Sequence, residues 1–181
     1  MRTDPPHGLA SWRHLLLAGA LALAALSPRA WDVERMAQAA QRLGPQAVQG
    51  VRALRPLLAS LEKADDAARL DAVNRFFNRR IVFGDDARVW RVDDHWASPL
   101  ESLQQGAGDC EDYAIAKYFS LLAIGMPASQ LRLVYVRLQV GGPGGASQPH
   151  MVLAYYASAT AEPLILDNLL GEIRPASRRP A

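Results

Sequence analysis

The stretch Gly-Asp-Cys-Glu-Asp-Tyr-Ala, residues 108–114, carries the only cysteine of the chain, Cys110. The residues that follow have a helical apolar pattern, so Cys110 lies at the first turn of a predicted helix. There the helix dipole and the free backbone N–H groups stabilise a thiolate, which is the nucleophilic form of cysteine. A small buried structural residue is the alternative, but three acidic neighbours disfavour apolar burial. The stretch therefore predicts a nucleophile.

The residues around this stretch predict where its helix begins and ends. Asp109 is a natural N-cap, and Asp112 lies three residues later, as in a capping box. The pair Gly125 and Pro127 ends the helix. Residues 84–108, which precede it, are rich in Asp, Trp, Gly and Pro and are expected to be irregular.

The apolar pattern changes from helical to alternating along the chain. Helices are predicted at residues 31–43, 46–59 and 67–78. Strands are predicted at residues 131–137, 151–156 and 164–166, with a glycine-rich loop at residues 141–145. Because helices come first and strands last, we expect an α+β domain with an antiparallel sheet.

The charge of the chain is concentrated at its N-terminus. Residues 1–30 hold three of the 20 basic and one of the 18 acidic residues, so the remainder carries 17 of each. A neutral body gives no electrostatic reason to expect a nucleic-acid partner. Because the chain has 50% hydrophobic and 21% charged residues, it is expected to be globular.

The first 30 residues resemble an export signal. Arg13 and His14 precede the run Leu15–Leu26, which is too short for the roughly 20 residues that span a bilayer. A buried helix is the alternative. The cleavage site is ambiguous because Pro28 would follow a cut after Ser27, so an uncleaved anchor remains open. We therefore expect a signal or anchor at residues 1–30, one domain at residues 31–181 and a periplasmic location.

His95 and His150 are the histidines outside this segment and the candidate bases. His150 opens one predicted strand and Asp167 closes the next. If the two strands form a hairpin, the numbers of any two paired residues add up to one constant sum. With a sum of 317, His150 and Asp167 are directly opposite each other, and with a sum of 319 they are diagonal neighbours on one face. With an even sum they lie on opposite faces of the sheet. A histidine would take the thiol proton and an aspartate would hold the imidazole. Residue spacing alone leaves this arrangement open.

Four blocks carry a family resemblance: Trp96–Glu101, Gly106–Tyr118, Pro149–Tyr155 and Leu164–Asn168. In this order they resemble the bacterial transglutaminase-like cysteine proteinases of the LapG type, over residues 74–177. The resemblance implies a papain/transglutaminase-like fold, in which a central helix with the nucleophile packs on an antiparallel sheet. It also implies a periplasmic endopeptidase with the triad Cys110, His150 and Asp167. Trp96, upstream of the nucleophile, is interpreted as a packing residue.

The resemblance implies a substrate and a partner as well. Members of this family cleave the N-terminal region of large surface adhesins beside paired alanines, and this releases cells from biofilms. An inner-membrane cyclic di-GMP receptor of the LapD type sequesters the protease. These expectations come from the resemblance alone.

The resemblance further implies calcium near the nucleophile, at Asp109, Glu111 and Asp112. Carboxylates beside Cys110 oppose thiolate formation, and a hard divalent cation would cancel that effect. The alternative is that the same acids cap the helix and favour its dipole. On the residues alone the two interpretations are equal.

Two other functions remain open. The same thiol, imidazole and carboxylate support acyl transfer to an amine, as in transglutaminases, because the motif does not specify whether water or an amine resolves the thioester. A catalytically weak binding relative is the third interpretation, because the pattern of the family continues past the point that matches Ala181.

Overall fold

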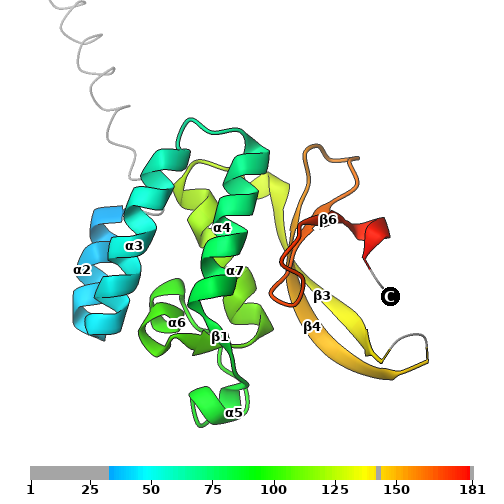
Figure 1. Ribbon diagram of the computed structural model, residues 1–181, viewed down its shortest axis with the longest axis horizontal. Helices are drawn as coiled ribbons and strands as arrows, with labels where there is room; N and C mark the ends of the chain where they lie inside the picture. Colours follow the sequence, from blue (N-terminus) through cyan, green and yellow to red (C-terminus); the bar gives the residue numbers. More distant parts are fainter. Residues whose placement is uncertain (1–32, 142–143, 180–181) are drawn as a thin grey trace, which may run out of the picture. The chain divides into compact units, whose positions relative to one another are not determined.

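The computed structural model describes residues 33–141 and 144–179, where a group of helices precedes an antiparallel sheet (Figure 1). The expected signal or anchor, residues 1–30, lies outside the described residues, and the domain division stays a prediction. Within the described residues no helix is both long and apolar enough to cross a membrane. The helices are α2 (Val33–Leu43), α3 (Pro45–Leu61), α4 (Asp66–Arg80), α5 (Asp86–Val89), α6 (Pro99–Gln105) and α7 (Cys110–Ala123).

The main sheet has four antiparallel strands in the order β3-β4-β5-β6. A separate parallel pair, β1 (Val82–Phe83) with β2 (Ala107–Gly108), joins the end of α4 to the start of α7. Two single-turn 3₁₀ helices, η1 and η2, precede β3 and follow β6. The elements of this half are η1 (Ala128–Gln130), β3 (Leu131–Val140), β4 (Ala146–Tyr155), β5 (Leu164–Leu166), β6 (Arg174–Pro175) and η2 (Ala176–Arg178).

Helix α7 lies between the helices and the sheet, packing on α4 on one side and on β4 on the other (Figure 1). Its side chains are therefore buried almost all round, including the apolar Ala114 and Leu121 that helical spacing predicts. The hydroxyl of Tyr155 in β4 donates to Asp66 Oδ2 at 2.6 Å, which fixes the sheet to the start of α4. Asp65 caps α4, because its Oδ1 accepts the backbone N–H of Ala68 at 2.8 Å.

Strand β4 is buried on both faces because each face packs in a different hydrophobic cluster. Met151, Leu153 and Tyr155 belong to the main core with the helices. Val152 and Ala154 alternate with them and form a second, smaller cluster with Ile165 of β5. The predicted α+β class with an antiparallel sheet is therefore confirmed, and β4 is the strand that connects the two clusters.

The expectation that residues 84–108 are irregular is wrong in two places. Asp85 caps the short helix α5 by accepting the backbone N–H of Arg88 at 2.9 Å. Ser98 and Glu101 form a capping box at the start of α6, where Pro99 occupies the first turn. Helix α6 packs on α3 and is followed at once by β2 and α7, so it fixes the approach to Cys110.

Candidate active site

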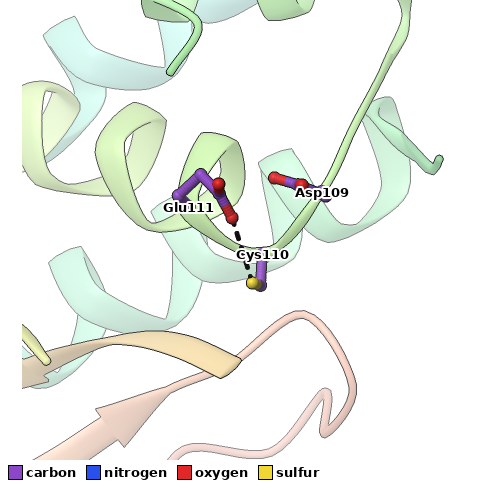
Figure 2. Close-up of side chains that lie close together, drawn as sticks. All are labelled: Asp109, Cys110 and Glu111. Atoms are coloured by element: carbon purple, nitrogen blue, oxygen red, sulfur yellow. Dashed lines mark hydrogen bonds between the residues drawn. The ribbon is translucent and has the colours of Figure 1, made fainter. Parts of the chain in front are cut away.

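Cys110 is the first residue of α7, and its side chain is half-buried between that helix and β4. Its thiol donates to Glu111 Oε2 at 3.1 Å, and Asp109 lies on the other side of the turn (Figure 2). The backbone N–H of Met151 in β4 donates to the sulfur. The sulfur therefore lies where the first turn of α7 meets the strand that carries His150.

The surroundings of the thiol oppose its ionisation. Burial raises the pKa of the Cys110 thiol to about 12, and the hydrogen bond to Glu111 acts in the same direction. The N–H of Met151 lowers the pKa, and the charges of Glu111 and Asp109 raise it. The expected help from the helix start is therefore outweighed by burial and by the acidic neighbours that sequence analysis identified.

The second half of the candidate site is an ion pair between two strands. His150 Nε2 and Asp167 Oδ1 are 2.9 Å apart, and both side chains are buried. Strands β4 and β5 pair Leu153 with Leu166, a sum of 319, so His150 and Asp167 are diagonal neighbours on one face. Of the three registers that the sequence left open, the structure has the second.

Hydrogen-bond donors surround Asp167. Leu169 N–H donates to Oδ1 at 3.1 Å, and Arg179 pairs with Oδ2. Burial alone would raise the pKa of Asp167, but the hydrogen bonds from His150, Leu169 and Arg179 outweigh it and hold the pKa below its usual range. Because an ionised carboxylate only accepts, Nε2 of His150 carries the hydrogen, and Nδ1 keeps a lone pair that is free to accept a proton.

The contact between the thiol and the imidazole stays a prediction. Met151 and Leu153 pack toward the helices, so strand alternation assigns His150 to the opposite side of β4. The sulfur lies against the backbone of Met151, the next residue. A contact between Nδ1 and the sulfur therefore has to pass the edge of β4. The structure brings together His150 with Asp167 and Cys110 with Met151.

Five carboxylates gather beside Cys110, two more than sequence analysis identified. The predicted ligands Asp109 and Glu111 form one group with the thiol, and Asp109 and Asp112 form another with Asp86. A third group joins Glu111 to Asp86 and Asp94. In each group the candidate ligand atoms lie within 4.8 Å of one another. Asp86 is only 4% exposed although it begins a short surface helix, because it turns inward.

The expected capping box at Asp109 and Asp112 is only half formed. Asp109 occupies the N-cap position, but its side chain makes no capping hydrogen bond. Asp112 accepts the backbone N–H of Ala97 through Oδ1 at 2.8 Å, and the backbone N–H of Asp109 also donates to its carboxylate. Asp112 Oδ2, Asp109 Oδ1 and Asp86 Oδ1 are buried and have no hydrogen-bond partner in the described residues. The side chain of Asp109 is thus turned toward the cluster rather than toward the helix.

These carboxyl groups perturb one another's ionisation. Burial raises the pKa of Asp109 to about 8, and the carboxylates of Glu111, Asp86 and Asp112 add to the effect. Burial also raises the pKa of Asp112 to about 6, against the hydrogen bond from Ala97. Buried, unpaired carboxylate oxygens at this density are the donor set of a hard divalent cation, so the residues present fit calcium.

His95, the other candidate base, lies at the rim of the acidic cluster. Its ring stacks against Trp90 with centroids 4.2 Å apart, and its Nε2 is 3.9 Å from Glu101 Oε1. Its backbone N–H donates to Asp86 Oδ2. Trp96 is 52% exposed and is not a buried packing residue. His150 is therefore the histidine that the structure pairs with a buried aspartate.

The sequence of the chain matches a family model described as bacterial transglutaminase-like cysteine proteinase BTLCP over residues 52–180. The chain belongs to this family. The bacterial transglutaminase-like cysteine proteinases are peptidases, which agrees with a cysteine at the start of α7 and a buried histidine–aspartate pair in the sheet. A comparison with curated proteins found no match.

Solved structures of Legionella pneumophila LapG are similar to this family member in sequence and fold. One LapG structure is 40% identical with a TM-score of 0.70, over 82% of this chain and 77% of that chain. An EGTA-treated LapG structure matches equally well. A calcium-bound LapG structure is also 40% identical with a TM-score of 0.70, and 79% of it is covered. The transglutaminase-like fold predicted from the sequence is thereby confirmed.

Proposed function

We propose that this protein is a calcium-dependent cysteine endopeptidase in which Cys110, His150 and Asp167 act as the catalytic triad. The observation that carries the proposal is the buried pair of His150 Nε2 and Asp167 Oδ1, which are 2.9 Å apart. The next residue after His150 is Met151, whose backbone N–H contacts the thiol of Cys110. Membership of a cysteine proteinase family supports the same reaction.

The roles of the three residues follow from their hydrogen bonds. Nδ1 of His150 accepts the proton of the Cys110 thiol, and the sulfur attacks the carbonyl carbon of a peptide bond. The leaving amine then takes the proton from the imidazolium, and a water molecule resolves the thioester. Asp167, held by Leu169 and Arg179, stays ionised and stabilises the imidazolium while its own proton count is unchanged.

The acidic cluster supports the calcium part of the proposal. Asp109, Glu111 and Asp112 would hold the ion, together with Asp86 and Asp94, which the structure adds to the set. Bound calcium would supply positive charge beside the carboxylates that hold the pKa of the Cys110 thiol high. Legionella pneumophila LapG was solved with calcium and after EGTA treatment, which supports the same assignment.

The natural substrate, location and partner are proposed from the family. We propose a periplasmic enzyme that cleaves the N-terminal region of a large surface adhesin beside paired alanines and so controls release from biofilms. An inner-membrane cyclic di-GMP receptor of the LapD type is its proposed partner. The similarity to LapG supports this placement.

One experiment tests the geometry without a substrate. The reagent 1,3-dibromoacetone joins a thiol to an imidazole that lies within its short span, with loss of two bromides. Because Cys110 is the only cysteine, we expect peptide mapping of the calcium-loaded full chain to show a single cross-link to His150. The Cys110→Ala variant is the control. A cross-link to His95, or mono-alkylation alone, would reject the triad.

A second experiment tests the reaction. The full chain is incubated with the N-terminal region of a large adhesin that contains paired alanines, in Ca²⁺ or EGTA, beside Cys110→Ala. Two fragments formed by the wild type in Ca²⁺ alone establish the calcium-dependent endopeptidase. A covalent adduct with an added primary amine would establish the acyltransferase, and capture of the adhesin without conversion would establish a binding protein.

A further inference from the structure

Asp167 lies one residue beyond the last paired residue of β5. Strands β4 and β5 pair as far as Leu153 with Leu166, and β5 pairs with β6 only at its first two residues. The strand pairing therefore does not hold the backbone of Asp167, although its carboxylate lies 2.9 Å from His150. Because the end of so short a strand opens easily, the position of this carboxylate depends on a support from outside the sheet.

Asn78 of α4 provides a support of this kind. Its Nδ2 atom donates to the backbone carbonyl of Asp167 at 2.7 Å. Its Oδ1 atom is buried and has no hydrogen-bond partner among the described residues. A buried amide with one half unpaired costs stability relative to an apolar side chain of similar size, so packing alone does not account for asparagine at this position.

The same end of α4 is held to the helix that carries the nucleophile. Ile81 directly follows α4, and its backbone carbonyl accepts a hydrogen bond from the hydroxyl of Tyr113. Tyr113 is buried in α7, three residues after Cys110, and α4 packs directly on α7 (Figure 1). The last turn of α4 therefore contacts α7 through Ile81 and the end of β5 through Asn78.

The other hydrogen bonds to Asp167 come from the sheet half of the molecule. Leu169 belongs to the loop that follows β5, Arg179 lies after η2, and His150 belongs to β4. Within the described residues, the hydrogen bond from Asn78 is the one that reaches Asp167 from a helix. It is therefore the contact that relates the carboxylate to the helices and to Cys110.

We propose that Asn78 is a positioning residue that holds Asp167, and through it the imidazole of His150, in place relative to Cys110. The inference rests on the proposed function, because that function assigns the orientation of the imidazole to Asp167. Asn78 contacts the backbone of Asp167 and acts through it. Without this donor the carbonyl of a residue that is 1% exposed would be left unpaired, and the end of β5 would shift.

Asn74 offers a matched control one helical turn earlier in α4. Its Nδ2 atom donates to the backbone carbonyl of Gly171 at 3.1 Å, and its Oδ1 atom is also buried without a partner among the described residues. Gly171 lies four residues after Asp167 in the chain. The two asparagines thus share their chemistry and their helix but hold different parts of the segment after β5.

The orientation of the imidazole can be measured without a substrate. Long-range ¹H–¹⁵N spectra of the full chain with ¹⁵N-labelled histidine report the tautomer of each ring at about pH 8, where imidazoles are usually neutral. The His150→Gln variant assigns the signals. We expect wild type and Asn74→Leu to show a hydrogen-bonded Nε2–H on His150, and Asn78→Leu to lose it. Wild type without this hydrogen bond, or Asn78→Leu with it, would overturn the proposal.

Kinetics separate positioning from packing. We expect Asn78→Leu to lose about tenfold to a hundredfold in kcat with KM unchanged, and Asn74→Leu to stay within about threefold of wild type. Asn78→Asp keeps the shape of the side chain, but its carboxylate cannot donate, so it should lose at least as much as Asn78→Leu. Melting temperatures are measured alongside.

Two results would identify Asn78 as a packing residue. They are an equal loss of kcat in Asn78→Leu and Asn74→Leu, and wild-type kcat in both variants of Asn78. Failure of the wild type to cleave the adhesin would instead reject the proposed function, and the histidine spectra would then decide whether Asn78 positions the imidazole.

Discussion

Replacement of Asp167 by asparagine tests the hydrogen-bond logic of the site most directly. The two carboxylate oxygens receive three donors, because His150 and Leu169 share Oδ1 and Arg179 pairs with Oδ2. An asparagine offers one oxygen and one NH₂ group. The guanidinium of Arg179 is the charged donor and takes the oxygen, so the NH₂ group faces His150 and the N–H of Leu169 loses its acceptor.

The imidazole then has to change its tautomer. Nε2 accepts from the new NH₂ group, and the hydrogen moves to Nδ1, which can no longer take the proton of the Cys110 thiol. The equivalent change in a Ser–His–Asp protease lowers kcat by about 10⁴-fold, which corresponds to about 5.5 kcal/mol in the barrier. We expect a loss of similar size in Asp167→Asn.

Arg179 provides the internal control. In the double variant Asp167→Asn with Arg179→Met, the amide is free to turn its oxygen toward Nε2, so at least about tenfold of the activity should return. Initial rates of adhesin fragment formation in saturating Ca²⁺ measure kcat, and circular dichroism monitors folding. Activity within threefold of wild type in the single variant, or no recovery in the double variant, would refute this reasoning.

Three further predictions concern the acidic cluster and its supports. The folded state raises the pKa of Asp109 to about 8 and that of Asp112 to about 6, so between these values and about 4 it binds more protons than the unfolded state. In EGTA the melting temperature should therefore fall as pH rises from about 4 to about 8. Saturating Ca²⁺ should flatten this slope, and an unchanged slope would count against the cation site. In Gly108→Ala the new Cβ would lie 2.5 Å from Asp112 Oδ2, so calcium affinity by calorimetry should weaken by about tenfold, whereas wild-type affinity would contradict the crowding. Ser98→Ala removes the hydroxyl that accepts the Glu101 N–H, which should lower the free energy of unfolding in urea by about 1 kcal/mol, and no loss would show that the cap is dispensable.

The sequence predicted the order of helices and strands because apolar periodicity reflects burial directly. It left the register between the strands of His150 and Asp167 open. It did not select among sums of 317, 319 and an even number, because that choice depends on where the short strand β5 is held. Leu164 and Leu166 point toward the helices, and the contact between Asn78 and the Asp167 carbonyl fixes the end of the strand.

The rest of the acidic cluster was not readable from spacing. Asp86 and Asp94 lie 24 and 16 residues before Cys110 in a stretch without periodic pattern, and they reach Glu111 only because α5 folds back. Two local signals were available. The Ser-Pro-x-Glu pattern at residues 98–101 is a capping box, and Lys117 interrupts an otherwise apolar helical face.

Cys110 and His150 belong to two elements, α7 and β4, that are synthesised at different times. The sulfur is carried by α7, whereas the imidazole arrives forty residues later in β4. While the polypeptide is still being synthesised, Cys110 is therefore present before His150. With His150 as the proposed base, cutting ability would begin only when the hairpin of β3 and β4 docks on α7.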